Sequence, residues 1–195
     1  MTTFVALLRA VNVGSTNRIK MVDLRAAFVD AGHVDAVTHI QTGNVIFTAR
    51  NDAATVKHTV EQLITDRFGL TITAIMRTDS QFRAIAESNP FIAERLPDDI
   101  SKLYVGFMDA QPAARDVDIF TTSPIGADDV RVVGNEVYIR YAVGAGTTKL
   151  TGGVWNKLGV EVTSRNWNVT TNLARLATDT DPTTTSASEK DLILV

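Results

Sequence analysis

The order of apolar patterns is the feature of this sequence that most constrains its fold. Apolar runs typical of strands alternate with apolar residues at helical spacing, in the order strand, helix, strand, strand, helix, strand. The turn residues at 41–44 separate the two middle strands and indicate a hairpin. The predicted ranges of this half are 3–11, 21–31, 34–40, 45–49, 52–68 and 70–76.

The same order recurs in the second half of the chain. It begins after a helix over 80–87 and a turn at Asn89 and Pro90, and its predicted ranges are 102–108, 112–120, 131–133, 136–141, 149–158 and 160–163. This is the order of the ferredoxin-like split unit. We therefore predict an α+β protein with two ferredoxin-like βαββαβ halves and an additional C-terminal helix over 168–177. The expected subdomains are 1–78 and 79–178, and residues 179–195 are expected to form a flexible tail.

Composition excludes several classes of protein. The chain has 195 residues, of which 45% are hydrophobic and 21% charged, as in soluble globular proteins. It has no cysteine, which excludes a thiol nucleophile, a zinc site built on thiolates and a disulfide framework. Because Arg9 interrupts the first apolar run and no cationic run precedes it, we expect neither a signal peptide nor a membrane span, and a cytoplasmic location.

A first candidate ligand site combines the loop after the first strand with the hairpin. In a ferredoxin-like half both segments lie at the same end of the sheet. Glycines let backbone amides approach a ligand, amide side chains both donate and accept hydrogen bonds, and cations neutralise an anion. The residues that supply these groups are Asn12, Gly14, Arg18, Lys20, Gln41, Gly43 and Asn44. The alternative is that the glycines only permit turns, Asn12 caps a strand end and Lys20 is solvated.

A second candidate site combines the loop 143–149 with residues 164–168. Gly144, Gly146 and two threonines precede a predicted helix whose first turn holds Lys149, so amides, the helix dipole and a cation can meet one anion. Arg165 adds a bidentate donor. Trp167, with Asn166 and Asn168 beside it, can stack on a ring. The alternatives are a capped helix with Thr147 or Thr148 as N-cap, and a tryptophan buried in the core.

Other catalytic and metal patterns are missing from the sequence. His33, His39 and His58 do not have metal-ligand spacing, and no Ser, His and Asp arrangement is recognisable, so catalytic residues are unassigned and no metal site is expected. RNA binding is the alternative function, because an RRM has the same element order. It would use Tyr104, Tyr138 and Arg140 on one sheet face, if Leu103, Val105, Phe107, Val137 and Ile139 face the helices.

At these motifs the chain resembles the bacterial domain-of-unknown-function family DUF1697. The segments that carry the resemblance are Leu7–Met21, His39–Phe47, Asn89–Phe91, Lys102–Phe107 and Thr148–Asn168. The resemblance implies an α+β protein of two related subdomains without an assigned activity. The chain departs from the family pattern at Ser15, where a second glycine is usual, and at Thr147 and Thr148, where an Arg-Ser or Arg-Thr pair is usual.

These observations predict a protein that binds a phosphorylated or nucleotide-like small molecule, with the cofactor and any reaction unassigned. Lys20, Lys149 and Arg165 would neutralise charge, while amide side chains would orient the ligand. Ligand sites are common at domain junctions, so the two candidate sites are expected to face each other across one groove. The alternative is an RNA-binding or protein-interaction module without catalysis.

Overall fold

The computed structural model describes residues 1–94 and 99–179, and it divides into two compact units. Among the described residues, the first unit holds Met1–Arg83 together with 172–179, and the second unit holds Ala84–Thr171. The divisions fall within helices α3 (Asp79–Glu87) and α7 (Trp167–Asp179). Within the described residues, every helix is too short or too polar to span a bilayer. The tail was predicted to begin at residue 179, but Asp179 is the last residue of α7, and residues 180–195 of the predicted tail lie outside the described residues.

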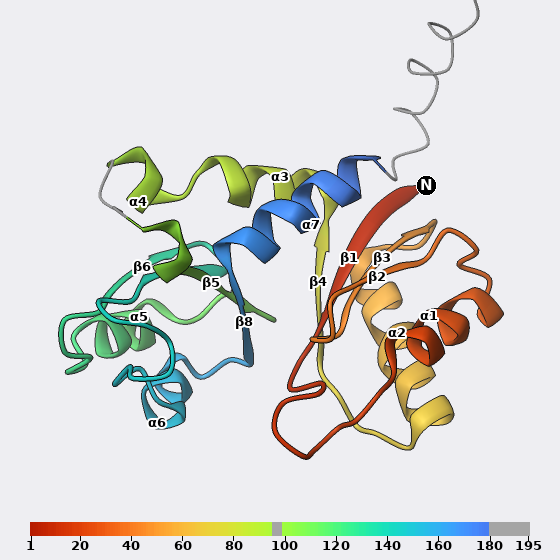
Figure 1. Cartoon of the computed structure of the whole chain (residues 1–195), viewed down its shortest axis with the longest axis horizontal. Helices are drawn as coiled ribbons and strands as arrows, with labels where there is room; N and C mark the ends of the chain where they lie inside the picture. The colour runs from red at the N-terminus through yellow and green to blue at the C-terminus, as the bar shows by residue number, and fades with distance from the viewer. Residues whose placement is uncertain (95–98, 180–195) are drawn as a thin grey trace, which may run out of the picture. The chain divides into compact units, whose positions relative to one another are not determined.

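The first unit contains one four-stranded antiparallel sheet in the order β2-β3-β1-β4 (Figure 1). This is the ferredoxin-like order that the apolar pattern predicted. Its elements are β1 (Thr2–Leu8), α1 (Met21–Asp30), β2 (Val37–His39), β3 (Asn44–Ala49), α2 (Ala53–Phe68) and β4 (Ala74–Thr78).

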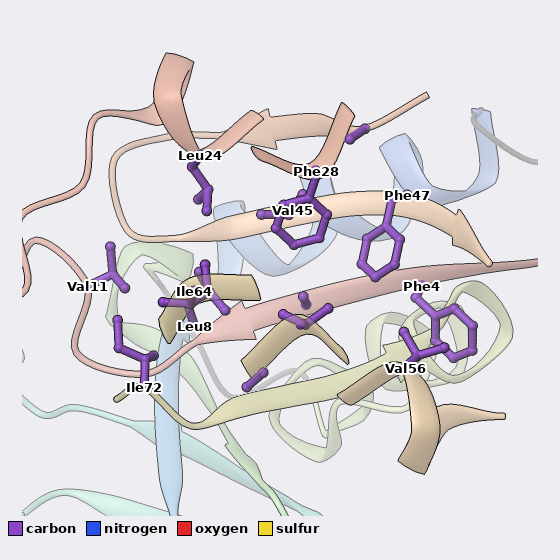
Figure 2. Packing of buried hydrophobic residues seen from close by; sticks show 14 of the residues in the cluster. Phe4, Leu8, Val11, Leu24, Phe28, Val45, Phe47, Val56, Ile64 and Ile72 are labelled. Carbon is purple, nitrogen blue, oxygen red and sulfur yellow. The ribbon is translucent and has the colours of Figure 1, made fainter. Parts of the chain in front are cut away.

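The core of the first unit lies between the two helices and one face of the sheet. Phe4 and Leu8 of β1 pack there with Phe28 of α1 and Ile64 of α2, and all are at most 2% exposed (Figure 2). Helix α2 follows the N-cap Asp52, whose carboxylate accepts hydrogen bonds from the amides of the first turn, and it is capped at its other end by Gly69 in a left-handed conformation. The buried apolar side chains thus fix which face of α2 packs on the sheet, and the two caps fix where the helix begins and ends.

The second unit repeats the order with a sheet β6-β7-β5-β8. Its core includes four fully buried side chains, those of Phe120, Val137, Ile139 and Leu158. Its elements are α4 (Pro90–Ala93), η1 (Ile100–Lys102), β5 (Leu103–Met108), α5 (Ala114–Thr121), β6 (Asp129–Val133), β7 (Glu136–Arg140), α6 (Gly152–Trp155), η2 (Asn156–Leu158) and β8 (Val162–Asn166).

Two predicted elements differ from the structure in ways that matter for the candidate sites. The first strand ends at Leu8 because the chain turns with Ala10 at φ 55°, although Val11 is still buried. The predicted helix over 149–158 is wrong: only α6 and η2 form there. Gly152 and Gly153 disfavour a longer helix, and the Thr148 hydroxyl accepts a hydrogen bond from Leu150 N in a local turn.

Candidate functional site

The loop 9–20 and the β2–β3 hairpin meet at one end of the first sheet, as their topology predicted. The amide of Leu8 donates to the carbonyl of Gly43 over 2.8 Å, and Asn12 Nδ2 donates to the carbonyl of Gln41 over 2.8 Å. The hairpin is therefore bonded to the end of β1 and to Asn12 in the first half of the loop.

Asn12 organises this loop through its side chain. Besides the bond to Gln41, its Nδ2 donates to the carbonyl of Ile19 over 2.8 Å, and its Oδ1 accepts from Ile19 N over 3.0 Å. One amide group thus closes the loop on itself and ties it to the hairpin. The sequence prediction that Asn12 orients a ligand directly stays untested, but these bonds indicate a role in positioning the loop.

The backbone of this region is strained. Among the described residues, the non-glycine residues with positive φ are Ala10, Asn12, Asn17 and Ile40, at 55°, 54°, 48° and 49°. A β-branched residue such as Ile40 rarely adopts this conformation. Such strain persists only where the surroundings enforce it, and it is concentrated at functional sites. The strained backbone therefore marks the loop and the hairpin as a candidate functional site of the first unit.

A cleft of about 580 Å³ opens beside the loop, at the start of helix α1. Its lining residues are Asn12, Arg18, Ile19, Lys20, Asp23, Gln41 and Phe68. Arg18 and Lys20 are exposed, and neither forms an ion pair with a carboxylate of the described residues. Lys20 is also the N-cap of α1 and its side chain does not cap the helix. The cleft therefore combines two cations that have no carboxylate partner with the N-terminus of a helix whose N-cap side chain makes no capping hydrogen bond.

The structure separates the predicted residues of this site into two groups. Asn12, Lys20 and Gln41 line the cleft. Asn44 is fully buried and donates to the carbonyl of His39, and Gly43 lies where a side chain would meet Val11. Gly14 is at φ +61° in an open part of the loop. Asn44 and Gly43 thus shape the hairpin.

Asp23 and Phe68 line the cleft but were missed by the sequence analysis. Asp23 is in the first turn of α1, one helical turn from Lys20. Phe68 ends α2, which leads into β4, and Leu8 of β1 pairs with the first residue of β4. The same topological reasoning that joined the loop and hairpin could have found Phe68, because the start of β4 lies at that sheet end.

The loop of the second candidate site is held toward the β6 edge of its sheet. The Thr148 hydroxyl donates to the carboxylate of Asp128, and the Ala142 amide donates to the same carboxylate over 2.8 Å. Lys149 is exposed, and its side chain lies beside Gly126. The prediction that Lys149 is in the first turn of a helix is wrong, since α6 begins at Gly152. Gly144 accepts hydrogen bonds from Thr147.

The residues 164–168 lie on the opposite edge strand, β8, and at the start of α7. Arg165 is 7% exposed, and its guanidinium donates to Thr163 Oγ1 over 2.9 Å and to the carbonyl of Ser164 over 2.8 Å. Burial lowers the pKa of Arg165 to about 10. Asn166 Oδ1 accepts from Val169 N, Trp167 is buried as its alternative interpretation expected, and Asn168 is exposed.

The tyrosine platform expected for RNA binding is wrong. Tyr104 of β5 pairs with Ile139 of β7, so these two share a face, and Tyr138 pairs with Val105 on the other face. Tyr104 packs at the edge of the core with its ring centroid 5.0 Å from that of Tyr141. Tyr138 is 1% exposed and its hydroxyl donates to the carbonyl of Ile85 over 3.1 Å. The register of the two strands, which the sequence does not display, decides this.

The described residues contain no cluster of three or more His, Asp or Glu side chains arranged to hold a metal ion. The two candidate sites lie in different units, so their convergence on one groove stays a prediction.

Comparison with known proteins identifies the family of the chain. The model of the family described as "Protein of unknown function (DUF1697)" matches residues 1–138. The chain belongs to this family. The match contains the whole loop and hairpin of the first candidate site and ends before Lys149 and Arg165 of the second.

Among solved structures, this DUF1697 protein is similar to the conserved bacterial protein SP0830 from Streptococcus pneumoniae. The TM-score is 0.69 at 17% identity, over 90% of this chain and 98% of the other. The likeness supports the fold. No curated protein matches the chain.

Proposed function

We propose that the protein binds a small phosphorylated molecule in the cleft of the first unit. The observation that carries the proposal is the pair of cations, Arg18 and Lys20, that line the cleft without a carboxylate partner among the described residues. Two guanidinium or ammonium groups at the start of a helix are a favourable environment for an anion.

The residues that line the cleft offer three kinds of contact to a ligand: positive charge, hydrogen bonds and an apolar surface. Arg18 and Lys20 face the phosphate charge, and the exposed amide of Gln41 supplies a donor and an acceptor for the rest of the ligand. Phe68 is half-buried and offers an apolar surface. The cleft volume of about 580 Å³ is in the range of small-molecule sites.

Asp23 limits which anions the cleft accepts. Its carboxylate lines the same cleft and occupies the first turn of α1. It repels a bare anion but accepts hydrogen bonds from a hydroxyl or an amine. A ligand with a donor group near its phosphate, such as a sugar phosphate, therefore fits better than inorganic phosphate.

Calorimetric titration of the full chain with ribose 5-phosphate, AMP and inorganic phosphate tests the proposal. We expect saturable binding of the organic phosphates and a loss of at least about tenfold in affinity in Lys20→Gln, since a charged hydrogen bond contributes about 1.5–3 kcal/mol. Arg115→Gln, which removes an exposed arginine of α5, is the matched control. The absence of saturable binding, or an equal loss in both variants, would refute the proposal.

The same titration with a single-stranded oligonucleotide distinguishes this function from RNA binding. A single-stranded oligonucleotide should bind no more tightly than its mononucleotide, and its affinity should not fall steeply with salt. Preference for the polymer would favour the nucleic-acid alternative instead.

A further inference from the structure

A second cavity in the first unit lies at the opposite end of the same sheet. Its volume is about 350 Å³. It includes Ala49, which pairs with Thr2 at the start of β1, whereas the first cleft lies beyond Leu8 at the end of β1. The residues that line it are Met1, Gly32, His33, Thr48, Ala49, Arg50, Asn51, Val56 and Thr59. None of these residues lines the first cleft.

The imidazole of His33 is held in one orientation at this cavity. Its Nδ1 lies 2.9 Å from the carbonyl oxygen of Thr48. A carbonyl only accepts, so Nδ1 carries the proton that makes this hydrogen bond. The ring lies edge-on to Phe47, with centroids 4.6 Å apart, and 6.0 Å from the ring of Phe28. Both phenylalanines are fully buried members of the core, which Figure 2 shows from close by, so they give His33 a rigid wall.

The same segment is fixed a second time at Thr48. The amide of Thr48 donates to Asp35 Oδ2 over 2.9 Å, so side chains of the α1–β2 connection bond both backbone groups of this residue. With Nδ1 fixed in this way, Nε2 is the nitrogen left for a ligand, and it has no hydrogen-bond partner among the described residues. His33 is thus a preorganised polar group in a cavity.

The charge and polarity of the lining favour one class of ligand. Arg50 is exposed at the cavity, and no carboxylate lines it. Two amides of the first turn of α2 are already occupied, because Asp52 accepts from the amides of Ala54 and Thr55. A carboxylate has two oxygens, which one arginine and one imidazole can satisfy, whereas a phosphate has more oxygens than these two side chains can reach. Ala49 and Val56 supply apolar walls.

We propose that this cavity is a second binding site, which takes a small organic carboxylate with an apolar body. The carboxylate accepts hydrogen bonds from Arg50 and from Nε2–H of protonated His33, and the apolar body lies against Val56 and Ala49.

Benzoate is the probe, and the three histidines of the chain are the reporters. In NMR spectra of the full protein, benzoate should shift the ring resonances of His33 saturably. His58 lines a different recess on α2 and His39 is on β2, so their resonances should stay in place. Equal shifts at all three histidines, or no saturable shift at millimolar benzoate, would overturn the proposal.

A substitution tests the role of His33. His33→Gln removes the imidazole that lines the cavity, so benzoate affinity should fall severalfold. Unchanged affinity in His33→Gln would show that the imidazole does not hold the carboxylate, and would overturn the proposal.

Two exposed positions complete the test without a risk to folding. Arg50→Gln should weaken benzoate binding severalfold, while Arg115→Gln, at an exposed position of α5, should leave it unchanged. Inorganic phosphate should bind this cavity more weakly than benzoate does. Unchanged benzoate affinity in Arg50→Gln, or stronger binding of phosphate, would refute the ligand class.

Discussion

Arg77 and Arg165 occupy equivalent positions in the two sheets. Arg77 of β4 pairs with Val5 of β1, and Arg165 of β8 pairs with Val105 of β5. Each is 7% exposed, and each guanidinium donates over 2.8 Å to the carbonyl of the residue before it. The two halves therefore share a buried arginine on an edge strand, although their sequences show no evident repeat.

This equivalence predicts that Arg165 stabilises the fold. In Arg165→Ala the carbonyl of Ser164 loses a buried donor, so we expect the free energy of unfolding to fall by about 2–4 kcal/mol in chemical denaturation. Lys149→Ala, at an exposed position, should change it by less than about 0.5 kcal/mol. If Arg165→Ala instead keeps its stability and loses affinity for anions, the ligand-binding role predicted from the sequence holds.

Gly43 should tolerate a side chain far less well than Gly14. A Cβ at Gly43 would lie 2.9 Å from Val11 Cβ and 3.0 Å from Leu8 Cβ, at φ +71°. A Cβ at Gly14 would meet nothing within 4 Å, although its φ is +61°. Gly14→Ala therefore carries only the left-handed penalty of about 1–2 kcal/mol, and Gly43→Ala adds a steric cost of similar size. Melting temperatures of the two variants measure the difference, and equal values would contradict the close approach.

Asn12 can be tested with a pair of substitutions that separate its side chain from its backbone. Asn12→Ala and Asn12→Gly both remove the bonds to Ile19 and Gln41, but glycine accepts the φ of 54° without strain. We expect both to weaken ribose 5-phosphate binding, and Asn12→Ala to be the less stable by about 1 kcal/mol. Full affinity in Asn12→Gly would show that the loop keeps its shape without the amide.

The order of elements was predictable because apolar periodicity and turn residues are local signals. The hairpin at 41–44 and the cap at Asp52 are examples. Contacts that depend on register or on distant segments were not. The pairing of Tyr104 with Ile139, for example, depends on how the two strands align. The length of the 149–158 helix was overestimated because tertiary packing did not compensate for Gly152 and Gly153.

Tyr141 predicts a loss of stability in alkali. Burial raises its pKa to about 12, with smaller effects from Tyr104 and Asp128, against 10.0 for an exposed tyrosine. The folded state therefore keeps the phenol proton more strongly than the unfolded state does. This contribution to stability is complete below pH 10 and is lost as the pH rises toward 12, by about 1.4 kcal/mol per pH unit.

Tyr141→Phe removes this titration and keeps the ring. Between about pH 8 and about pH 11, urea unfolding should show that the wild type loses about 1.4 kcal/mol more stability than the variant does. Burial lowers the pKa of Arg165, and a lowered pKa makes the free energy of unfolding increase as the pH rises, opposite to the effect of Tyr141. This contribution of Arg165 is the same in the wild type and in Tyr141→Phe. Parallel losses in wild type and Tyr141→Phe would show that the Tyr141 hydroxyl reaches water in the folded state.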